Sequence, residues 1–303
     1  MDSLIYPSGG DTKFRFSSTW VIGWFVRTVL DMDDLSRVHV EKDAPTDSIR
    51  PYTFKSLVDV FVSLAKQLGC VNVIVGGHDW GCMIAYRMAI WHPDFVTHIF
   101  TACVPYLLPN AEWVEIERLA KIYPTFGYQL QFGSGIIEQK TRTKEGIRNF
   151  LNAAYDGRTS DKQSAIDATK GVDFNLTAQL EKTALLSEEE LEYYVHEFAR
   201  NGLHGACNYY RNHHQNFLDD SYFTRQADSD AAIIKCPALF LCATEDKYIR
   251  PEMTEGIKKS LSNLTFKEIN ASHWILWEKP GIVNGVLREW FWQHGLVNNN
   301  KGS

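Results

Sequence analysis

The chain has no excess of positive charge, no paired-cysteine motif and no long apolar run. Its 303 residues include 31 lysines and arginines against 37 aspartates and glutamates, a net charge of −6. Without a basic surface to neutralise phosphates, we expect no nucleic-acid partner. The six cysteines form no C-x-x-C pair or metal-ligand spacing, which is typical of free thiols in a reducing compartment. The adjacent histidine pair at 213–214 lacks surrounding carboxylates, so we expect no metal site there.

No segment has the pattern of a membrane span or an export signal. The first 19 residues are polar, and the apolar stretch 20–30 is interrupted by Arg27 and is too short to cross a bilayer. We therefore expect no membrane partner and a cytoplasmic location. Hydrophobic residues make up 45% of the chain and aromatic residues 13%, enough for a sizeable core.

The first half alternates helix-like and strand-like segments. Residues 52–68 have the apolar spacing of an amphipathic helix that ends at Gly69. A β-branched run at 71–75 predicts a strand buried on both faces, 83–91 a helix and 96–104 another buried strand. This order predicts an α/β protein with a parallel sheet and crossover helices.

The turn between the strand at 71–75 and the next helix carries the strongest chemical signal. Gly77 and Gly81 flank Asp79 at two residues on either side, as in a G-x-nucleophile-x-G turn with aspartate in place of serine. The helix that follows points its N-terminal N–H groups at the carboxylate, which favours the ionised, nucleophilic form. The alternative is a glycine-rich turn whose aspartate only caps the helix.

The second half supplies an acid and a histidine after predicted strands. Residues 236–243 predict a buried strand, followed by Asp246, and a strand ending at 267–269 precedes His273. Nucleophile, acid, histidine is the chain order of the α/β-hydrolase triad. In that arrangement Asp246 orients His273, and His273 activates water.

Three motifs give this pattern a family resemblance. GGHDWG at 76–81, CATEDKYIRPEM at 242–253 and SHW at 272–274 resemble the soluble epoxide hydrolases, particularly fungal members. The resemblance implies an α/β-hydrolase fold, a mostly parallel sheet flanked by helices with a helical cap inserted. The two halves of the core then span 1–106 and 231–303.

The cap predicted by this resemblance covers 107–230. Its helix-like stretches 112–122 and 187–200 agree with a helical insert, and the second opens with the capping-box pattern Ser187 to Glu190. Tyr128 in GYQLQF and Tyr210 in NYYRN resemble the two cap tyrosines that polarise the epoxide in that family. Phenols suit this task because the epoxide oxygen needs strong donors as it becomes an alkoxide.

The resemblance also implies a two-step mechanism without metal or cofactor. Asp79 attacks an epoxide carbon to form an alkyl–enzyme ester, and water activated by His273 and Asp246 hydrolyses that ester to a diol. The backbone N–H of Trp80 is expected to stabilise the oxyanion, and His78 to shape the turn. The abundance of apolar residues in the cap suggests that the substrate is a small hydrophobic epoxide. By analogy with fungal relatives, we expect this substrate to be a secondary metabolite.

One family feature is missing from the sequence. The HGxP loop, which supplies a second oxyanion-hole N–H, has no match, because the His-Gly pairs at 204–205 and 294–295 lack the proline. Residues 23–32 resemble the strand after that loop, whereas 33–42 depart from the family's turn. The early strands are then lost, rebuilt from 13–22 or removed by a wrong start. With one donor fewer, we expect ester hydrolysis to suffer more than ester formation, by about 10²–10³ in rate.

Three other functions are compatible with the sequence. A haloalkane dehalogenase also uses such an aspartate, but a leaving halide gains little from two phenols. An epoxide-opening cyclase would deliver a hydroxyl of the substrate in place of water. A non-catalytic, ligand-binding relic would follow from the missing loop. The substrate's identity and the oligomeric state are not determined by the sequence.

Overall fold

The computed structural model describes residues 20–22, 48–226 and 230–297, with the backbone alone for 20–22. The chain folds into two compact units. The described part of the first, here called the sheet unit, comprises 20–22, 58–108 and 230–297. The second, the helical unit, comprises 48–57 and 109–226. The predictions for segments 23–32 and 33–42 concern residues outside those that the structure describes.

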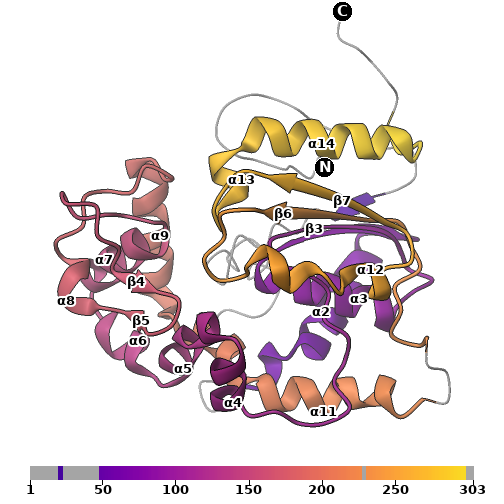
Figure 1. Cartoon of the computed structure of the whole chain (residues 1–303), viewed down its shortest axis with the longest axis horizontal. Helices are drawn as coiled ribbons and strands as arrows, with labels where there is room; N and C mark the ends of the chain where they lie inside the picture. Colours follow the sequence, from indigo (N-terminus) through magenta and orange to yellow (C-terminus); the bar gives the residue numbers. More distant parts are fainter. Residues whose placement is uncertain (1–19, 23–47, 227–229, 298–303) are drawn as a thin grey trace, which may run out of the picture. The chain divides into compact units, whose positions relative to one another are not determined.

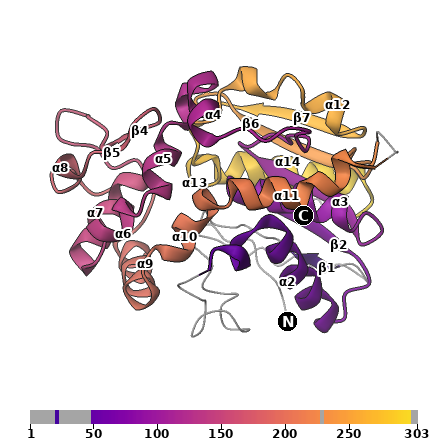
Figure 2. The ribbon, with the colours of Figure 1, turned by 90° about the horizontal axis from the view of Figure 1, so that it is seen from below.

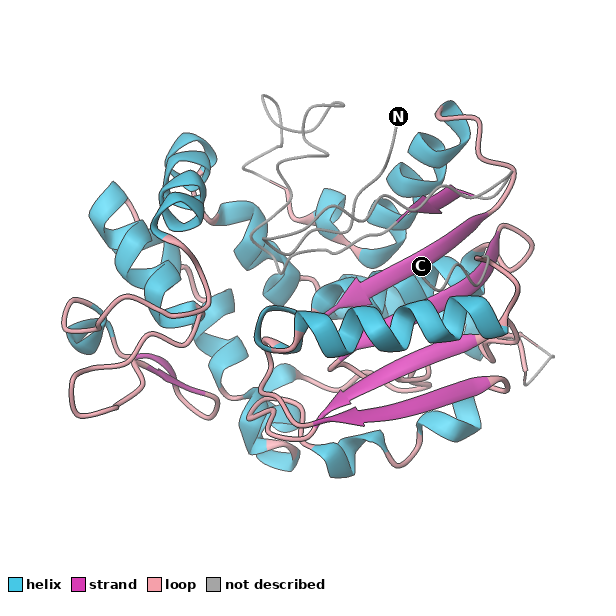
Figure 3. Ribbon diagram, turned by 90° about the horizontal axis from the view of Figure 1, so that it is seen from above, coloured by secondary structure: helices cyan, strands magenta, loops and turns pink. Residues whose placement is uncertain are grey.

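A single five-stranded sheet forms the centre of the sheet unit (Figure 3). Its strand order is β1-β2-β3-β6-β7, and each neighbouring pair is parallel. The strands are β1 (Trp20–Ile22), β2 (Val73–His78), β3 (Val96–Ala102), β6 (Ala238–Ala243) and β7 (Leu264–Ile269). Parallel neighbours place their carboxyl ends at one edge, where open α/β sheets carry their functional groups.

Helices cover both faces of this sheet (Figure 1). The sheet unit contains α3 (Trp80–Trp91), η4 (Pro251–Thr254), α12 (Ile257–Ser260), α13 (Ile275–Glu278) and α14 (Pro280–Gln293), and α2 (Phe54–Gln67) enters it from the helical unit. The helix α14 lies on one face and α3 on the other (Figure 1).

Side chains of the strands contribute to the core on both faces of the sheet. Ile74, Phe100 and Leu239 point to the α14 face, where they pack with Trp290 and Phe291. Successive strand residues point to opposite faces, so both faces of these strands are buried. Burying each large apolar side chain contributes about 1.5–3 kcal/mol, and this packing fixes the strand ends on which the candidate site depends.

The helical unit is built mostly from short helices (Figure 2). These are η1 (Arg50–Tyr52), α4 (Ile116–Ile122), η2 (Pro124–Phe126), α5 (Tyr128–Gly133), α6 (Ile136–Lys140), α7 (Lys144–Ala154), α8 (Phe174–Thr177), α9 (Glu188–Asn201), α10 (His204–Asn208), η3 (Tyr209–Arg211) and α11 (His213–Thr224). Within the described ranges, no helix combines the length and apolar character needed to cross a bilayer.

This unit also contains a hairpin that the sequence did not predict. The strands β4 (Ile166–Asp167) and β5 (Gly171–Val172) pair antiparallel. Two-residue strands are too short to show an alternating pattern, which explains the omission. The unit also includes 48–57, which the sequence prediction assigned to the first half of the core.

Most predicted elements appear with small shifts of their ends. The predicted helix 52–68 is α2, and Gly69 follows it with φ 78°, as expected for a residue that ends a helix. The helix α4 starts later than predicted, because Glu115 has an extended backbone. The capping box at the start of α9 is present, with Ser187 and Glu190 each accepting from the other's backbone N–H.

Candidate active site

Asp79 occupies a strained turn between β2 and α3. Its φ is 53° and its ψ −127°, outside the regions that L residues prefer. A Cβ added to Gly77 would lie 2.4 Å from the carbonyl oxygen of Gly81, so only glycine permits this close approach. The side chain of Asp79 makes no capping hydrogen bond to α3, which argues against the role of a simple helix cap.

The predicted acid and histidine lie beside this aspartate. Nδ1 of His273 is 2.8 Å from Oδ2 of Asp246, and its Nε2 is 3.6 Å from Oδ1 of Asp79. The backbone N–H groups of Tyr248 and Ile249 donate to the other carboxylate oxygen of Asp246, at 2.8 and 3.1 Å. All three side chains of the triad are buried or nearly so. Asp246 therefore fixes the ring of His273 with its second nitrogen toward Asp79.

Burial and charge act against each other at each member of the triad. Burial lowers the pKa of His273, but the negative charges of Asp246 and Asp79 and the hydrogen bond to Asp246 outweigh it and raise the pKa to about 9. Burial raises the pKa of Asp246, but the charge and hydrogen bond of His273 lower it overall. The two opposite shifts have one cause, because each side chain favours the charged form of the other.

The pKa of Asp79 differs from the expectation based on the N-terminus of α3 alone. Burial raises its pKa, whereas the positive charge of His273 and the backbone N–H of Trp80 lower it, and the net shift is upward. The α3 N-terminus does favour the ionised form, as predicted, but desolvation is the larger effect. A partly desolvated carboxylate held by one cation is suited to nucleophilic attack.

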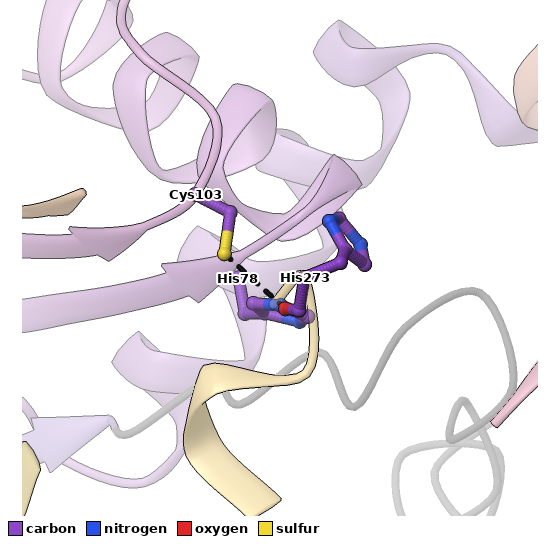
Figure 4. Close-up of side chains that lie close together, drawn as sticks. All are labelled: His78, Cys103 and His273. Carbon is purple, nitrogen blue, oxygen red and sulfur yellow. Dashed lines mark hydrogen bonds between the residues drawn. The ribbon is translucent and has the colours of Figure 1, made fainter. Parts of the chain in front are cut away.

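His78, Cys103 and His273 bring potential metal-ligating atoms within 4.8 Å of one another (Figure 4). However, Nε2 of His78 and the thiol of Cys103 are both hydrogen-bonded to the backbone carbonyl of His273, at 2.8 and 3.2 Å. A metal ion requires lone pairs that converge on it. Here hydrogens converge on an oxygen, so the group surrounds a carbonyl and not a cation.

The two predicted tyrosines meet in the helical unit. Tyr128 opens α5 and Tyr210 lies in η3, and their ring centroids are 5.8 Å apart at 76°. Phe132 packs against both rings, at 5.4 and 4.9 Å. Tilted and edge-to-face contacts of this kind are the preferred geometry of aromatic pairs, so the three rings restrict how the phenols can turn.

The N-terminal end of α5 is attached to the β4–β5 hairpin (Figure 2). The side chain of Gln131 donates to the carbonyl of Val172 and accepts from its N–H, at 2.9 and 2.7 Å. The N–H of Tyr128 donates to the carbonyl of Ala168 at 3.0 Å. The first turn of α5, which carries Tyr128, thus has a fixed position on the hairpin.

Arg211 holds the other end of α5 to the segment that carries the second tyrosine. Its Nε donates to the carbonyl of Gly133 at 3.0 Å, and its guanidinium pairs with Glu138 of α6. A Cβ on Gly133 would lie 3.3 Å from the carbonyl oxygen of Tyr210, so the two backbones are close. Arg211 and Glu138 are 73 residues apart in the chain, so this pair was not predicted from the sequence.

The structure thus brings together Asp79, Asp246 and His273 in one unit and Tyr128 with Tyr210 in the other. It also places His78 at the end of β2 against the backbone of His273. The strand β1 at 20–22 pairs with β2 and lies within 13–22, the segment named in one of the three alternatives for the early strands.

Comparison with known proteins identifies the family of this chain. The family described as alpha/beta hydrolase fold matches residues 39–280. Epoxide hydrolase srdG of Neurospora crassa is 32% identical over 250 residues, which cover 80% of this chain and 72% of that protein. Bifunctional epoxide hydrolase 2 of Rattus norvegicus is 29% identical over 80% of this chain, but the match spans only 43% of the rat protein.

A solved structure extends the likeness to the fold. The crystal structure of epoxide hydrolase A from Mycobacterium thermoresistibile superposes with a TM-score of 0.68 at 22% identity and covers 89% of both chains. The chain therefore belongs to the α/β-hydrolase fold family and, within it, to the epoxide hydrolases. This membership confirms the predicted fold class and the prediction of a hydrolase.

Proposed function

We propose that this protein opens a small hydrophobic epoxide to a diol through a covalent ester on Asp79. The observation that carries the proposal is the carboxylate on a strained turn, 3.6 Å from a histidine whose other nitrogen is bound by Asp246. Attack of a carboxylate on an epoxide carbon gives an ester that water can hydrolyse, whereas attack of a serine alkoxide would give a stable ether. The names of the Neurospora and rat relatives support the same substrate class.

In the first half-reaction, a carboxylate oxygen of Asp79 forms a bond to an epoxide carbon as the carbon–oxygen bond of the ring breaks. The departing oxygen takes a proton from a phenol, and we assign this donation to Tyr128 and Tyr210. Their mutual packing with Phe132 supports a joint role. Two donors stabilise the developing alkoxide better than one.

In the second half-reaction, His273 changes from cation to base. Esterification removes the negative charge of Asp79, which is one of the charges that raise the pKa of His273. The imidazolium then gives up its proton, which replaces through solvent the one that the phenol lost, and the neutral imidazole takes a proton from the water that attacks the ester carbonyl. We assign the stabilisation of the oxyanion to the N–H of Trp80, which hydrogen-bonds to Asp79. The acyl–oxygen bond breaks, the diol leaves with a proton from the imidazolium, and the carboxylic acid proton of Asp79 returns to His273.

Single turnover in ¹⁸O-water tests this scheme. With enzyme in excess over styrene oxide, the diol should carry no label and the peptide containing Asp79 should gain one ¹⁸O atom, because water attacks the carbonyl of Asp79. Label in the diol instead would contradict an ester intermediate. The Asp79→Asn variant, which matches the native side chain in size, should show no turnover, with a loss of at least about 10⁴-fold.

The same assay separates the alternatives. Halide release from a chloroalkane without diol formation would indicate a dehalogenase, and a cyclic ether without solvent oxygen would indicate a cyclase. Equal ligand affinity in native protein and Asp79→Asn, with no turnover in either, would indicate a binding protein.

A further inference from the structure

The backbone carbonyl of His273 accepts two buried hydrogen bonds (Figure 4). Nε2 of His78 lies 2.8 Å from this oxygen and the thiol of Cys103 lies 3.2 Å from it. Both donors are almost completely buried, at 0% and 2% exposure. They lie at the carboxyl ends of β2 and β3, whereas His273 follows β7 at the far edge of the sheet. The loop after β7 is thus attached to two strands that are not its neighbours.

His78 acts in this bond as a neutral donor. Burial, together with the positive charge of His273, lowers the pKa of His78 to about 3. A carbonyl only accepts, so the single ring proton lies on Nε2. The other nitrogen, Nδ1, is buried and has no hydrogen-bond partner in the described part of the chain. Among the described residues, His78 therefore makes a hydrogen bond through one ring nitrogen, and the acceptor is the carbonyl of His273.

Cys103 has a backbone conformation that its side chain alone does not explain. Its φ is 73°, in the left-handed region that residues other than glycine rarely adopt. Its N–H donates to the carbonyl of Leu241 on β6 at 3.0 Å. The neighbouring strand thus holds this residue in an unfavourable conformation that directs the thiol at His273. Such strain persists only where the surrounding structure enforces it, and it is common near active sites.

Displacement of this carbonyl would move the ring that acts on water. His273 must keep Nδ1 on Asp246 and Nε2 toward Asp79, and its backbone is the fixed point from which both are reached. A displacement of about 1 Å lowers a rate by up to about 10²-fold. Asp79 belongs to the turn after β2, where Gly77 approaches the backbone of Gly81, and this contact does not involve the His273 carbonyl.

We propose that His78 and Cys103 are positioning residues that hold the backbone of His273 for ester hydrolysis. The proposal rests on the proposed function and adds a prediction of its own: loss of one donor slows the second half-reaction and leaves the first nearly intact. Neither residue exchanges protons with the substrate.

The test compares two buried thiols with similar bonds. Cys103→Ala removes the donor to His273, and Cys103→Ser supplies a hydroxyl in its place. Cys82→Ala is the matched control, because its thiol donates to the carbonyl of Ala102 at 3.0 Å and not to His273. Ester formation and ester hydrolysis are measured separately by rapid-quench intact mass with excess styrene oxide.

For Cys103→Ala we expect ester hydrolysis to slow about 10-fold with ester formation within about twofold, so ester accumulates. Cys103→Ser should restore most of the rate, and Cys82→Ala should leave the ratio of the two rates unchanged. Equal ratios in Cys103→Ala and Cys82→Ala would overturn the proposal. If Cys103→Ala does not fold, His78→Leu against His78→Gln, which keeps an N–H donor, provides the same comparison.

A second measurement does not require turnover. Titration of the His273 imidazole by NMR should give a lower pKa in Cys103→Ala than in native protein and Cys82→Ala, because the ring sits less firmly on Asp246, with which the thiol also interacts. An unchanged titration would overturn the positioning role. If native protein forms neither ester nor diol, but the His273 pKa is still lower in Cys103→Ala than in native protein, the result contradicts the proposed function and not the positioning of His273.

Discussion

The two units hold their candidate functional groups by different means. In the sheet unit, Asp79 is held by its own strained turn, and His273 is held by two side chains that donate hydrogen bonds to its backbone carbonyl. In the helical unit, Tyr128 and Tyr210 stand on short helical segments whose positions depend on side chains. Ring packing and the hydrogen bond from Arg211 to the Gly133 carbonyl link those segments.

This difference teaches where each unit is sensitive. In the sheet unit, Asp79 is held by its own turn and should tolerate substitution of the side chains around it, whereas His273 depends on the two donors to its carbonyl. A group fixed by side chains shifts when one contact is lost, without unfolding of the unit. We therefore expect substitutions outside the triad to affect ester formation through the helical unit and ester hydrolysis through the His273 carbonyl.

The largest expected effect comes from His273→Gln. Glutamine cannot act as a base, so turnover should fall about 10⁴-fold while ester formation continues. Intact mass should show stoichiometric ester on Asp79. His98→Gln, which alters a histidine on β3 outside the triad, is the control. Continued diol formation by His273→Gln would show that another group activates water.

Removal of one phenol should have the next largest effect. Tyr128→Phe and Tyr210→Phe should each slow ester formation about 10²-fold, because each removes one donor to the developing alkoxide. Ester hydrolysis should be unaffected. Tyr194→Phe, a buried tyrosine of the same unit, provides the control. Equal slowing of both half-reactions would assign the phenols a structural role.

Arg211→Lys tests whether side chains position the phenols. Lysine keeps the charge but cannot bond both the Gly133 carbonyl and Glu138 in the same geometry. We expect ester formation to slow about 10-fold, since the phenols are less well placed. Arg148→Lys, which alters the Arg148–Glu188 pair on α7 and α9, is the matched control. Equal rates in both variants would remove the contrast between the units.

The smallest effect concerns pH and the sheet unit alone. The pKa of His273 is about 9 in the folded protein against an ordinary 6.5, so its charge stabilises the fold fully below about pH 6.5 and this contribution is lost as the pH rises through 9. Asp246→Asn removes the main cause of that shift. The melting temperature of the variant should therefore fall less than that of native protein between pH 6.5 and 9. A parallel fall in both proteins would contradict the assignment.

The sequence predicted the triad because its signals are local. Two glycines around Asp79, a β-branched run before it and strand ends before Asp246 and His273 each lie within a few residues. The order of these segments then determines the parallel sheet. Tyr128 and Tyr210 were proposed only through family resemblance, because nothing near them in the sequence distinguishes functional from core tyrosines.

The remaining features could not be predicted because they depend on distant contacts. His78 and His273 are 195 residues apart in the chain, and Arg211 and Glu138 are 73 apart. The conformation of Cys103 has no signature in its neighbours. The upward shift of the Asp79 pKa likewise depends on burial, which the turn motif alone does not reveal.

The attachment of α5 to the β4–β5 hairpin has an evolutionary consequence. Gln131 bonds the backbone of Val172, and Gly127 lies so close to Thr169 that a Cβ there would come within 2.0 Å of its carbonyl oxygen. An insertion or deletion in this hairpin would displace Tyr128 without altering any residue of the helix. Changes in hairpin length are thus a simple route by which related proteins could adapt to epoxides of different size, with the chemistry of the sheet unit retained.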